Sequence, residues 1–329
     1  MPPLRILSRA DVEAAVDMPT AIATVRRAFV ELSTGQAHVP LRTAIPVSPD
    51  ATSLVMPAYL GGSGGLGLKV VNVYPGNIAR GLPLIHALVI VLDAATGAPV
   101  AALEGGGLTA LRTGAASGVA TDLLAWPDAR RLTVFGAGTQ AEPQALAVCA
   151  VRPIERVTIV STMPGSAQAL AERLAGQPTV PPAIDIVDNP ALAVADADII
   201  CTATTSPTPV FPAKALPDGV HINAIGAFTP ITREIPGEVV ARARIVVDQR
   251  VAAEAEAGDL VIPWRAGESP GPAAWTEIGL IAAGRAPGRQ SREEITLFKS
   301  VGNAVQDIAV AALAVQRAAE RGLGTVVEL

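Results

Sequence analysis

The stretch Arg-Leu-Thr-Val-Phe-Gly-Ala-Gly-Thr-Gln-Ala, residues 131–141, decides the fold of this chain. The apolar run over 132–135 predicts a β-strand, and the segment that continues to residue 151 predicts an α-helix. Gly136 permits the tight turn between them, Gly138 lets the backbone approach a phosphate, and Ala141 is small enough for close packing of helix on strand. The free amides at the start of such a helix bind an anion. A glycine pattern alone is typical of many turns, but its flanks favour a dinucleotide-binding domain of Rossmann type.

The composition excludes several classes of function. The chain has 329 residues, of which 50% are hydrophobic and 17% charged, and its formal net charge is −5. This length allows two domains with substantial cores. Lysine and arginine are scattered, so no nucleic-acid partner is expected. The longest apolar runs, at 88–92 and 308–315, are too short to cross a bilayer, and the N-terminus leads into no signal-type apolar core. We expect a cytoplasmic protein with a small-molecule substrate and no membrane partner.

The cysteines and histidines do not indicate a metal site. Cys149 and Cys201 lie in apolar segments without paired spacing, which favours buried thiols over a disulfide. The three histidines, His38, His86 and His221, are too dispersed for a zinc cluster. We therefore expect no metal.

From residue 131 onward the pattern alternates between strands and helices. Such alternation predicts a parallel sheet with helices on both faces, and hence an α/β domain. Its strands should be short and wholly apolar because both faces are covered. The expected strands are 132–135, 157–160, 184–187, 199–203, 221–225 and 245–247, and the expected helices include 166–174, 191–195 and 237–243.

The first 120 residues predict a different, α+β unit. A helix is expected after Ser8, with Asp11 in its first turn, and another over 20–33. Turn-rich strands at 42–47, 53–59, 66–73 and 87–93 favour antiparallel pairing, and 109–125 predicts a helix of small residues. Near the end of the chain, 263–272 predicts a Gly/Pro loop and 295–321 a single long helix.

Three cations stand among apolar or small residues: Lys69, Arg112 and Arg42. Each could extend its head group to solvent, which is the usual arrangement of an isolated cation. They could instead converge on a substrate carboxylate, which an arginine grips with two nitrogens and a lysine with one tunable charge. Spacing alone does not decide between these interpretations.

Several motifs in order along the chain resemble the ornithine cyclodeaminase/mu-crystallin family. Each motif alone is unspecific, but their order covers nearly the whole sequence. They are Arg42-Thr43 with Ile45-Pro46-Val47, Leu68-Lys69-Val70-Val71-Asn72, Pro75-Gly76-Asn77, Ala110-Leu111-Arg112-Thr113, Gly136-Ala137-Gly138-Thr139-Gln140-Ala141, Asn223-Ala224-Ile225-Gly226, and Ser300-Val301-Gly302-Asn303-Ala304, the last expected in the final helix.

The resemblance implies a Rossmann-type domain, residues 119–302, inserted into an α+β substrate-binding and dimerisation domain of residues 1–118 and 303–329. It implies a homodimer in which Arg42, Lys69 and Arg112 hold the substrate carboxylate and polarise its C–N centre. The implied cofactor is NAD or NADP. The residues expected to bind it are Gly136, Gly138, Thr139, Gln140, Ala141, Ser161, Thr162, Thr202, Ala203, Ile225, Gly226 and Ser300.

One departure from the family pattern narrows the expected reaction. In cyclodeaminating members an aspartate follows the Asn-Ala-Ile-Gly motif, whereas this chain has Phe228. A phenyl ring cannot pair with an ammonium, so we expect an NAD(P)H-dependent oxidoreductase that reduces the C=N bond of a small ketimine carboxylate such as Δ1-pyrroline-2-carboxylate. The alternatives are an amino-acid dehydrogenase or ornithine cyclodeaminase on the same fold, and a non-catalytic mu-crystallin-like ligand-binding protein. Phe228 could equally be a core aromatic.

The remaining candidates concern the substrate pocket. Met56 and Phe228 suggest a partly apolar lining, and Thr229 and Val301 are expected beside them. His86 could donate a proton to the imine nitrogen. The alternative for His86 is a hydrogen-bonded structural histidine.

Cofactor preference depends on the end of the second strand of the dinucleotide-binding domain. An acidic residue there would bind the ribose hydroxyls of NAD, and an arginine would bind the NADP phosphate. The strand over 157–160 is followed by Ser161 and Thr162, while Glu155 precedes it and so lies at the wrong end. Without a carboxylate to repel a phosphate, the sequence leans slightly to NADP.

Overall fold

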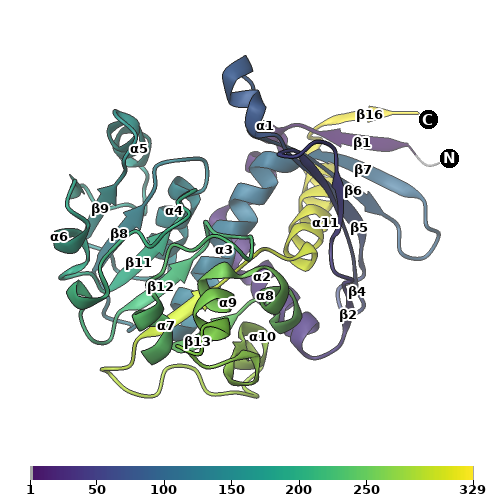
Figure 1. Ribbon diagram of the computed structural model, residues 1–329. Helices are drawn as coiled ribbons and strands as arrows, with labels where there is room; N and C mark the ends of the chain where they lie inside the picture. Colours follow the sequence, from purple (N-terminus) through teal and green to yellow (C-terminus); the bar gives the residue numbers. More distant parts are fainter. Residues whose placement is uncertain (1–2, 329) are drawn as a thin grey trace. The chain divides into compact units, whose positions relative to one another are not determined.

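The computed structural model describes residues 3–328, which form two compact units (Figure 1). One unit comprises the chain up to Arg112 together with the chain from Asn303 onward, and the other is Thr113–Gly302. The chain passes between them inside α3 (Gly105–Leu124) and again just before α11 (Ala304–Arg321). Within residues 3–328, no helix combines the length and apolarity that a membrane span requires.

The Thr113–Gly302 unit is built on an eight-stranded sheet in which all neighbouring strands are parallel. The strand order is β10-β9-β8-β11-β12-β15-β13-β14. The order therefore reverses between β8 and β11, and dinucleotides bind at such a reversal in a Rossmann-type sheet. The strands are β8 (Arg131–Phe135), β9 (Arg156–Val160), β10 (Ile184–Ile186), β11 (Ile199–Thr202), β12 (His221–Ala224), β13 (Arg244–Val247), β14 (Thr276–Glu277) and β15 (Thr296–Lys299).

Both faces of this sheet are covered, as the apolar strands predict. Alternate residues of one strand enter different apolar clusters: Ile200 of β11 belongs to one, and Ile199 and Cys201 belong to the other. Cys149 and Cys201 are both buried thiols, as expected. The helices of the unit are α4 (Ala141–Val151), α5 (Ser166–Leu174), α6 (Pro190–Val194), α7 (Gly237–Arg242), α8 (Arg250–Glu256), α9 (Gly258–Arg265) and α10 (Ile278–Ala282).

The prediction of one long helix over 295–321 is wrong. Residues Thr296–Lys299 form strand β15, which lies between β12 and β13, and only Ala304–Arg321 is helical. A strand covered on both faces has no polar alternation, so periodicity cannot separate it from a buried helical segment. The true start of α11 is marked by Asn303, whose side chain accepts a hydrogen bond from the Val305 amide. Ser300 and Val301 therefore precede the helix.

The predicted loop at 263–272 is also partly wrong. Pro263 lies inside α9, which continues to Arg265. A proline removes one helical hydrogen bond, and this one lies in the last turn.

The other unit is an antiparallel sheet packed against helices. Its strand order is β16-β1-β7-β6-β5-β4-β2, with β3 paired to β4, and only β1 and β7 are parallel. Helix α11 packs against β4, β5 and β6 and against α2. The elements are β1 (Leu4–Leu7), α1 (Arg9–Ala15), α2 (Met18–Ser33), β2 (Ala37–His38), β3 (Thr43–Pro46), β4 (Thr52–Leu60), β5 (Gly65–Val73), β6 (Ile85–Leu92), β7 (Pro99–Glu104) and β16 (Thr325–Val327).

His221 makes the stability of the Thr113–Gly302 unit depend on pH. Its ring lies fully buried in β12, 2.9 Å from Oγ1 of Thr296 and 3.2 Å from Oδ1 of Asn223. Burial lowers the pKa of His221 from 6.5 to about 3, and the charge of Arg289 contributes. The unfolded chain therefore takes up a proton near pH 6.5 that the native protein does not, and stability is lost as the pH falls below that value.

We expect the variant His221→Gln to lose less stability on acidification than the wild type. The difference should approach about 1.4 kcal/mol of unfolding free energy per pH unit between about pH 6 and pH 4. Urea unfolding at both pH values measures it, and titrating carboxylates common to both proteins cancel in the comparison. Parallel pH profiles for the two proteins would contradict a neutral buried His221.

Candidate active site

The glycine turn after β8 has the geometry that its sequence predicts. Gly136 adopts φ 97°, a conformation that side chains disfavour, and a Cβ there would lie 2.4 Å from the carbonyl oxygen of Ala203. A Cβ on Gly138 would meet no atom within 4 Å. The first glycine is thus required by the protein's own packing. The second leaves open space at the start of α4, which fits a bound phosphate.

The other candidate cofactor residues follow the carboxyl ends of neighbouring parallel strands, the edge at which such sheets bind dinucleotides. Ser161 and Thr162 follow β9, Ala203 follows β11, and Ile225 and Gly226 follow β12. Thr139 and Gln140 lie in the glycine turn, Thr202 ends β11 and Ser300 follows β15. The topology therefore places all of these residues along one edge of the same sheet.

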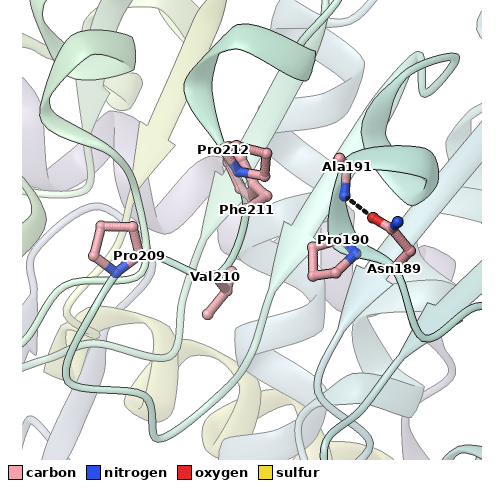
Figure 2. Close-up of a pocket in the computed structure, with 7 residues that line it drawn as sticks. All are labelled: Asn189, Pro190, Ala191, Pro209, Val210, Phe211 and Pro212. Atoms are coloured by element: carbon pink, nitrogen blue, oxygen red, sulfur yellow. Dashed lines mark hydrogen bonds between the residues drawn. The ribbon is translucent and has the colours of Figure 1, made fainter.

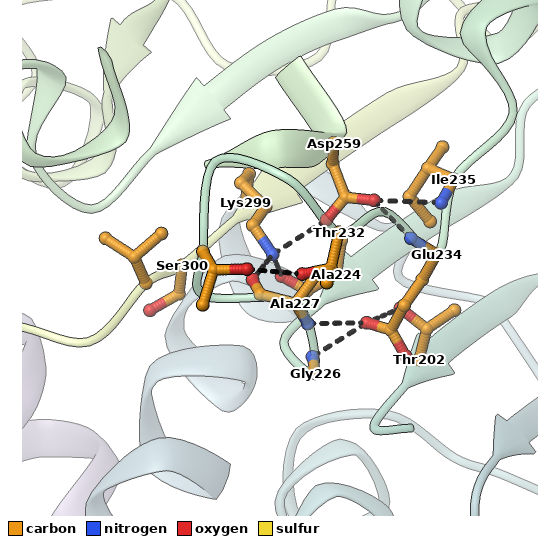
Figure 3. A network of polar contacts seen from close by, with 12 residues as sticks. Thr202, Ala224, Gly226, Ala227, Thr232, Glu234, Ile235, Asp259, Lys299 and Ser300 are labelled. Atoms are coloured by element: carbon orange, nitrogen blue, oxygen red, sulfur yellow. Dashed lines mark hydrogen bonds and ion pairs between the residues drawn. The ribbon is translucent and has the colours of Figure 1, made fainter. Parts of the chain in front are cut away.

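A buried carboxylate that the sequence interpretation missed anchors this edge. Glu234 is fully buried and accepts hydrogen bonds from Oγ1 of Thr202 at 2.9 Å and from the Thr204 amide at 2.7 Å. It also accepts from the amides of Gly226 at 2.7 Å and Ala227 at 3.2 Å (Figure 3). The Thr202 hydroxyl thus serves the protein's own structure. Glu234 ties the ends of β11 and β12 together.

Asp259 and Lys299 complete the network. Oδ1 of Asp259 accepts from the amides of Glu234 at 2.6 Å and Ile235 at 2.9 Å, and Oδ2 lies 2.8 Å from Nζ of Lys299. Lys299 also donates to the carbonyls of Ala224 and Ala227 (Figure 3). Burial raises the pKa of Glu234, and Asp259 raises it further. The network therefore fixes the loop that carries Ile225, Phe228 and Thr229.

A second buried carboxylate holds the turn after β15. Oδ2 of Asp248 accepts from Oγ of Ser300 at 2.8 Å and from the amides of Val301 at 3.0 Å and Gly302 at 2.9 Å. Burial raises the pKa of Asp248. Val301, expected to line the substrate pocket, is only 6% exposed and packs in an apolar cluster of the Thr113–Gly302 unit.

In the other unit, two of the three candidate cations converge on one carboxylate. Nζ of Lys69 lies 2.7 Å from Oδ2 of Asp307, and Nε of Arg112 lies 2.8 Å from Oδ1. Nη1 of Arg112 also donates to Oε1 of Gln306 at 2.6 Å. Lys69 is 1% exposed, Arg112 5% and Asp307 0%. The interpretation in which these cations extend to solvent is therefore wrong for Lys69 and Arg112.

The electrostatic environment of Lys69 makes it a candidate acid. Its pKa is lowered from 10.5 to about 8, mainly by burial and then by the charge of Arg112. Asp307 raises the pKa, and Arg42 lowers it further. Arg42 therefore acts electrostatically on the same ammonium as Arg112 and Asp307. A lysine that titrates near neutral pH can transfer a proton during a reaction.

The register of β4, β5 and β6 decides which of the other candidate residues lie on the same face of the antiparallel sheet as Lys69. Met56 pairs directly with Lys69, so its buried side chain lies beside the cation. His86 pairs with Asn72, which is an odd number of residues from Lys69 along β5. Successive side chains of a strand alternate between faces, so His86 points to the opposite face of the sheet from Lys69. The structure does not bring His86 to the cation cluster.

Two of the candidate residues after β9 and β12, Thr162 and Phe228, are exposed. Phe228 is 36% exposed, so it is not a core aromatic. Oγ1 of Thr229 lies 2.8 Å from Oγ1 of Thr232. Thr162 is exposed, while the Ser161 hydroxyl lies 2.7 Å from that of Ser166.

A hollow of about 450 Å³ lies elsewhere in the Thr113–Gly302 unit (Figure 2). It is lined by Asn189, Pro190, Ala191, Pro209, Val210, Phe211 and Pro212. The Asn189 side chain caps α6 by accepting from the Ala191 and Leu192 amides. The lining carries no charged group, so we assign it no catalytic chemistry. Within residues 3–328, no group of three or more His, Cys, Asp or Glu side chains is arranged to hold a metal ion.

Comparison with known proteins agrees with this geometry. The family model of the ornithine cyclodeaminase/mu-crystallin family matches residues 4–322. A Δ1-pyrroline-2-carboxylate reductase of Bacillus cereus is 42% identical over 318 residues, which is 95% of this chain and 96% of the relative.

Two solved structures share the whole fold. Thermococcus litoralis Δ1-pyrroline-2-carboxylate reductase in complex with NADH and L-proline is 41% identical, with a TM-score of 0.93 over 98% of this chain and 99% of that one. An archaeal alanine dehydrogenase dimer with bound NAD is 33% identical, with a TM-score of 0.92 over 99% of both chains. The glycine turn, the parallel sheet and these full-length similarities lead to one conclusion: the chain belongs to the ornithine cyclodeaminase/mu-crystallin family.

Proposed function

We propose that this chain reduces the C=N bond of a small cyclic imino carboxylate, Δ1-pyrroline-2-carboxylate, to the amino acid with NAD(P)H. The observation that carries the proposal is the buried cluster of Lys69, Arg112 and Asp307, in which a lysine with a pKa near 8 lies beside an arginine. The chain is an NAD(P)-dependent oxidoreductase that acts on C–N bonds, and the relatives that resemble it across their full length include two pyrroline-2-carboxylate reductases.

The two arginines and the lysine have different proposed roles, which follow from the chemistry of their side chains. Arg42 and Arg112 bind the substrate carboxylate through guanidinium N–H donors, and in Arg112 the donor is Nη2, because Nε and Nη1 already face Asp307 and Gln306. Lys69 donates a proton to the imine nitrogen, and its lowered pKa makes this transfer possible near neutral pH. When bound, the nicotinamide supplies the hydride that adds to the α-carbon. The C=N bond thereby becomes CH–NH, and Lys69 then regains a proton from solvent.

The residues at the carboxyl edge of the parallel sheet fit the cofactor. The open space at Gly138 and the start of α4 suit the pyrophosphate. Thr139, Gln140, Ser161, Thr162, Ala203, Ile225 and Ser300 form the rest of the proposed cofactor site, with Thr202 contributing through its place at the end of β11. Phe228 and Thr229 are the proposed substrate-facing residues of the loop after β12.

We propose NADP as the preferred cofactor because no carboxylate follows β9. Ser161 and Thr162 occupy that position, and Glu155 lies at the amino end of the strand, where it pairs with Arg130. The variant Thr162→Asp should lower kcat/KM with NADPH relative to NADH by about tenfold or more, because the new charge repels the 2′-phosphate. Steady-state kinetics with both cofactors measures the ratio.

The matched control for this prediction is Glu155→Gln, which removes a carboxylate from the opposite end of the same strand. We expect it to leave the NADPH/NADH ratio unchanged. If Thr162→Asp also leaves the ratio unchanged, Thr162 does not approach the 2′ position of the cofactor.

We propose a cytoplasmic homodimer that forms through the face of the antiparallel sheet opposite Lys69. That face carries half-buried Leu66, Leu68 and Val70 of β5, next to Leu88 of β6, which is 46% exposed. A continuous aliphatic face that solvent reaches favours association. The archaeal alanine dehydrogenase with the same fold is a dimer.

Turnover of a preformed imine tests the function. The purified chain should oxidise NADPH or NADH when Δ1-pyrroline-2-carboxylate is added, and form proline. Ammonia released from ornithine without net cofactor turnover would instead support a cyclodeaminase, and oxidation with a 2-oxo acid and ammonia alone would support an amino-acid dehydrogenase. Binding of cofactor and ligand without turnover would support a non-catalytic ligand carrier and overturn the proposal.

A further inference from the structure

Asp307 is the carboxylate that contacts both Lys69 and Arg112. It lies in the first turn of α11 and is fully buried. One of its carboxylate oxygens faces the ammonium of Lys69 and the other faces Nε of Arg112, at 2.7 and 2.8 Å. The neighbouring Gln306 accepts a hydrogen bond from Nη1 of the same arginine. Two nitrogens of Arg112 are thus held by α11, which leaves Nη2 as the part that we assign to the substrate.

We propose that Asp307 is the positioning residue of this site, which holds Lys69 and Arg112 in place and keeps Lys69 protonated until the imine is bound. This inference deepens the proposed function. Only the identity of the substrate rests on that proposal. Asp307 acts through Lys69 and Arg112.

The charges around Lys69 explain why the cluster needs this carboxylate. The charged groups that act on its ammonium are Arg42, Arg112 and Asp307. The neighbouring strands contribute apolar side chains to the same face, Met56 from β4 and Val89 from β6. Without Asp307, the ammonium of Lys69 would lose the carboxylate that lies 2.7 Å from it while the charges of Arg112 and Arg42 still act on it, so the lysine would lose its proton more readily. With Asp307, the four groups Arg42, Lys69, Arg112 and Asp307 together keep a net charge of +2, which still attracts a monocarboxylate.

The lysine content of the chain makes a direct test possible. The sequence contains three lysines, Lys69, Lys214 and Lys299. Labelling with lysine carrying 13C at Cε should therefore give three resolved NMR signals, assigned with single lysine-to-arginine variants. Lys214 is exposed and serves as an internal reference. The titration midpoint of the Lys69 signal reports its protonation without any need for turnover.

The decisive variant is Asp307→Asn, which keeps the shape of the side chain and removes its charge. We expect the Lys69 midpoint to fall by about one pH unit or more, a tenfold or larger change in its proton dissociation constant. The basic limb of the kcat/KM profile should move to lower pH by the same amount. An unchanged or raised midpoint would overturn the inference.

Two further variants separate this role from general destabilisation. Asp259→Asn removes a buried aspartate paired with Lys299 in the other unit, and it should leave the Lys69 midpoint unchanged. A midpoint that moves equally in both variants would overturn the inference. Asp307→Glu keeps the charge and displaces it by one methylene. The Lys69 midpoint should stay close to that of the wild type while kcat/KM falls at least tenfold. If Asp307→Asn does not fold, Asp307→Glu provides the test in its place. Full activity in Asp307→Glu would contradict a positioning role.

The two readouts distinguish failure of the inference from failure of the proposed function. A shifted Lys69 midpoint in an enzyme that turns over no imine would retain the electrostatic role of Asp307 and remove the substrate assignment. An unshifted midpoint in an active reductase would remove only the role of Asp307.

Discussion

Replacing Lys69 with methionine is expected to lower kcat/KM for reduction of Δ1-pyrroline-2-carboxylate by about 10³-fold, the usual size of a lost general acid. Methionine fills a similar volume in the buried strand but can neither donate a proton nor pair with a carboxylate. The pH dependence follows from the same residue. Because the protonated lysine is the active form, kcat/KM of the wild type should fall as the pH rises through about 8.

Two variants make this expectation specific. Lys69→Arg keeps the positive charge, but arginine does not lose its proton in a protein, so it should remain about as inactive as the methionine variant. Lys214→Met changes an exposed lysine and should retain wild-type kinetics. NADPH binding measured by calorimetry should be the same in all of these proteins. A Lys69→Met variant within tenfold of wild-type kcat/KM would exclude Lys69 as the proton donor.

The parts of the fold that could be predicted are those encoded by local pattern. The strand, glycine turn and helix over 131–151 were confirmed, because each step depends on residues next to one another. The parallel sheet was confirmed for the same reason, since its strands are short apolar runs between helices. Strand β15 could not be predicted from its own residues, because a short apolar run fits a buried helix as well as a buried strand. Its pairing with β12 and β13 makes it a strand.

That error also concealed Asp307. Within a supposed helix over 295–321, Asp307 is one polar residue near the middle. In the structure the helix begins at Ala304, so Asp307 lies in its first turn. There the negative charge of Asp307 interacts favourably with the helix dipole, and its carboxylate faces Lys69. The sequence signal was Asn303, a favoured N-cap residue directly after Gly302.

The remaining differences depend on contacts between distant residues. Glu234, Asp259 and Lys299 are far apart in the sequence, and only the folded sheet brings them into one network. His86 illustrates a different difficulty. A strand's register fixes which face a side chain occupies, and a shift of one residue reverses it. The sequence allowed His86 as a proton donor but could not show that it lies on the opposite face of the sheet from Lys69.

The glycine turn offers the second large effect, because its two glycines are required for different reasons. In Gly136→Ala, the added Cβ would lie 2.4 Å from a backbone oxygen in a region of positive φ. We expect a loss of about 3 kcal/mol in unfolding free energy, from backbone strain and the displaced Ala203. Because the turn can no longer present the start of α4, NADPH affinity should fall at least about 100-fold.

Gly138→Ala should separate binding from folding. Its Cβ would meet no protein atom within 4 Å, so the unfolding free energy should change by less than about 0.5 kcal/mol. If the cofactor's phosphates approach the backbone at this point, the new methyl group should still raise the Kd for NADPH at least about tenfold.

Gly76→Ala is the matched control, because Gly76 also has open space and no positive φ but lies outside the dinucleotide-binding unit. It should leave NADPH binding unchanged. Urea unfolding and calorimetric titration of the three variants measure both quantities. Wild-type affinity in Gly138→Ala would mean that the pyrophosphate does not lie against Gly138, and wild-type stability in Gly136→Ala would contradict the close contact with Ala203. Only a loss of stability confined to Gly136→Ala, with a loss of affinity in both turn variants, agrees with a turn that is shaped by the protein at its first glycine and by the cofactor at its second.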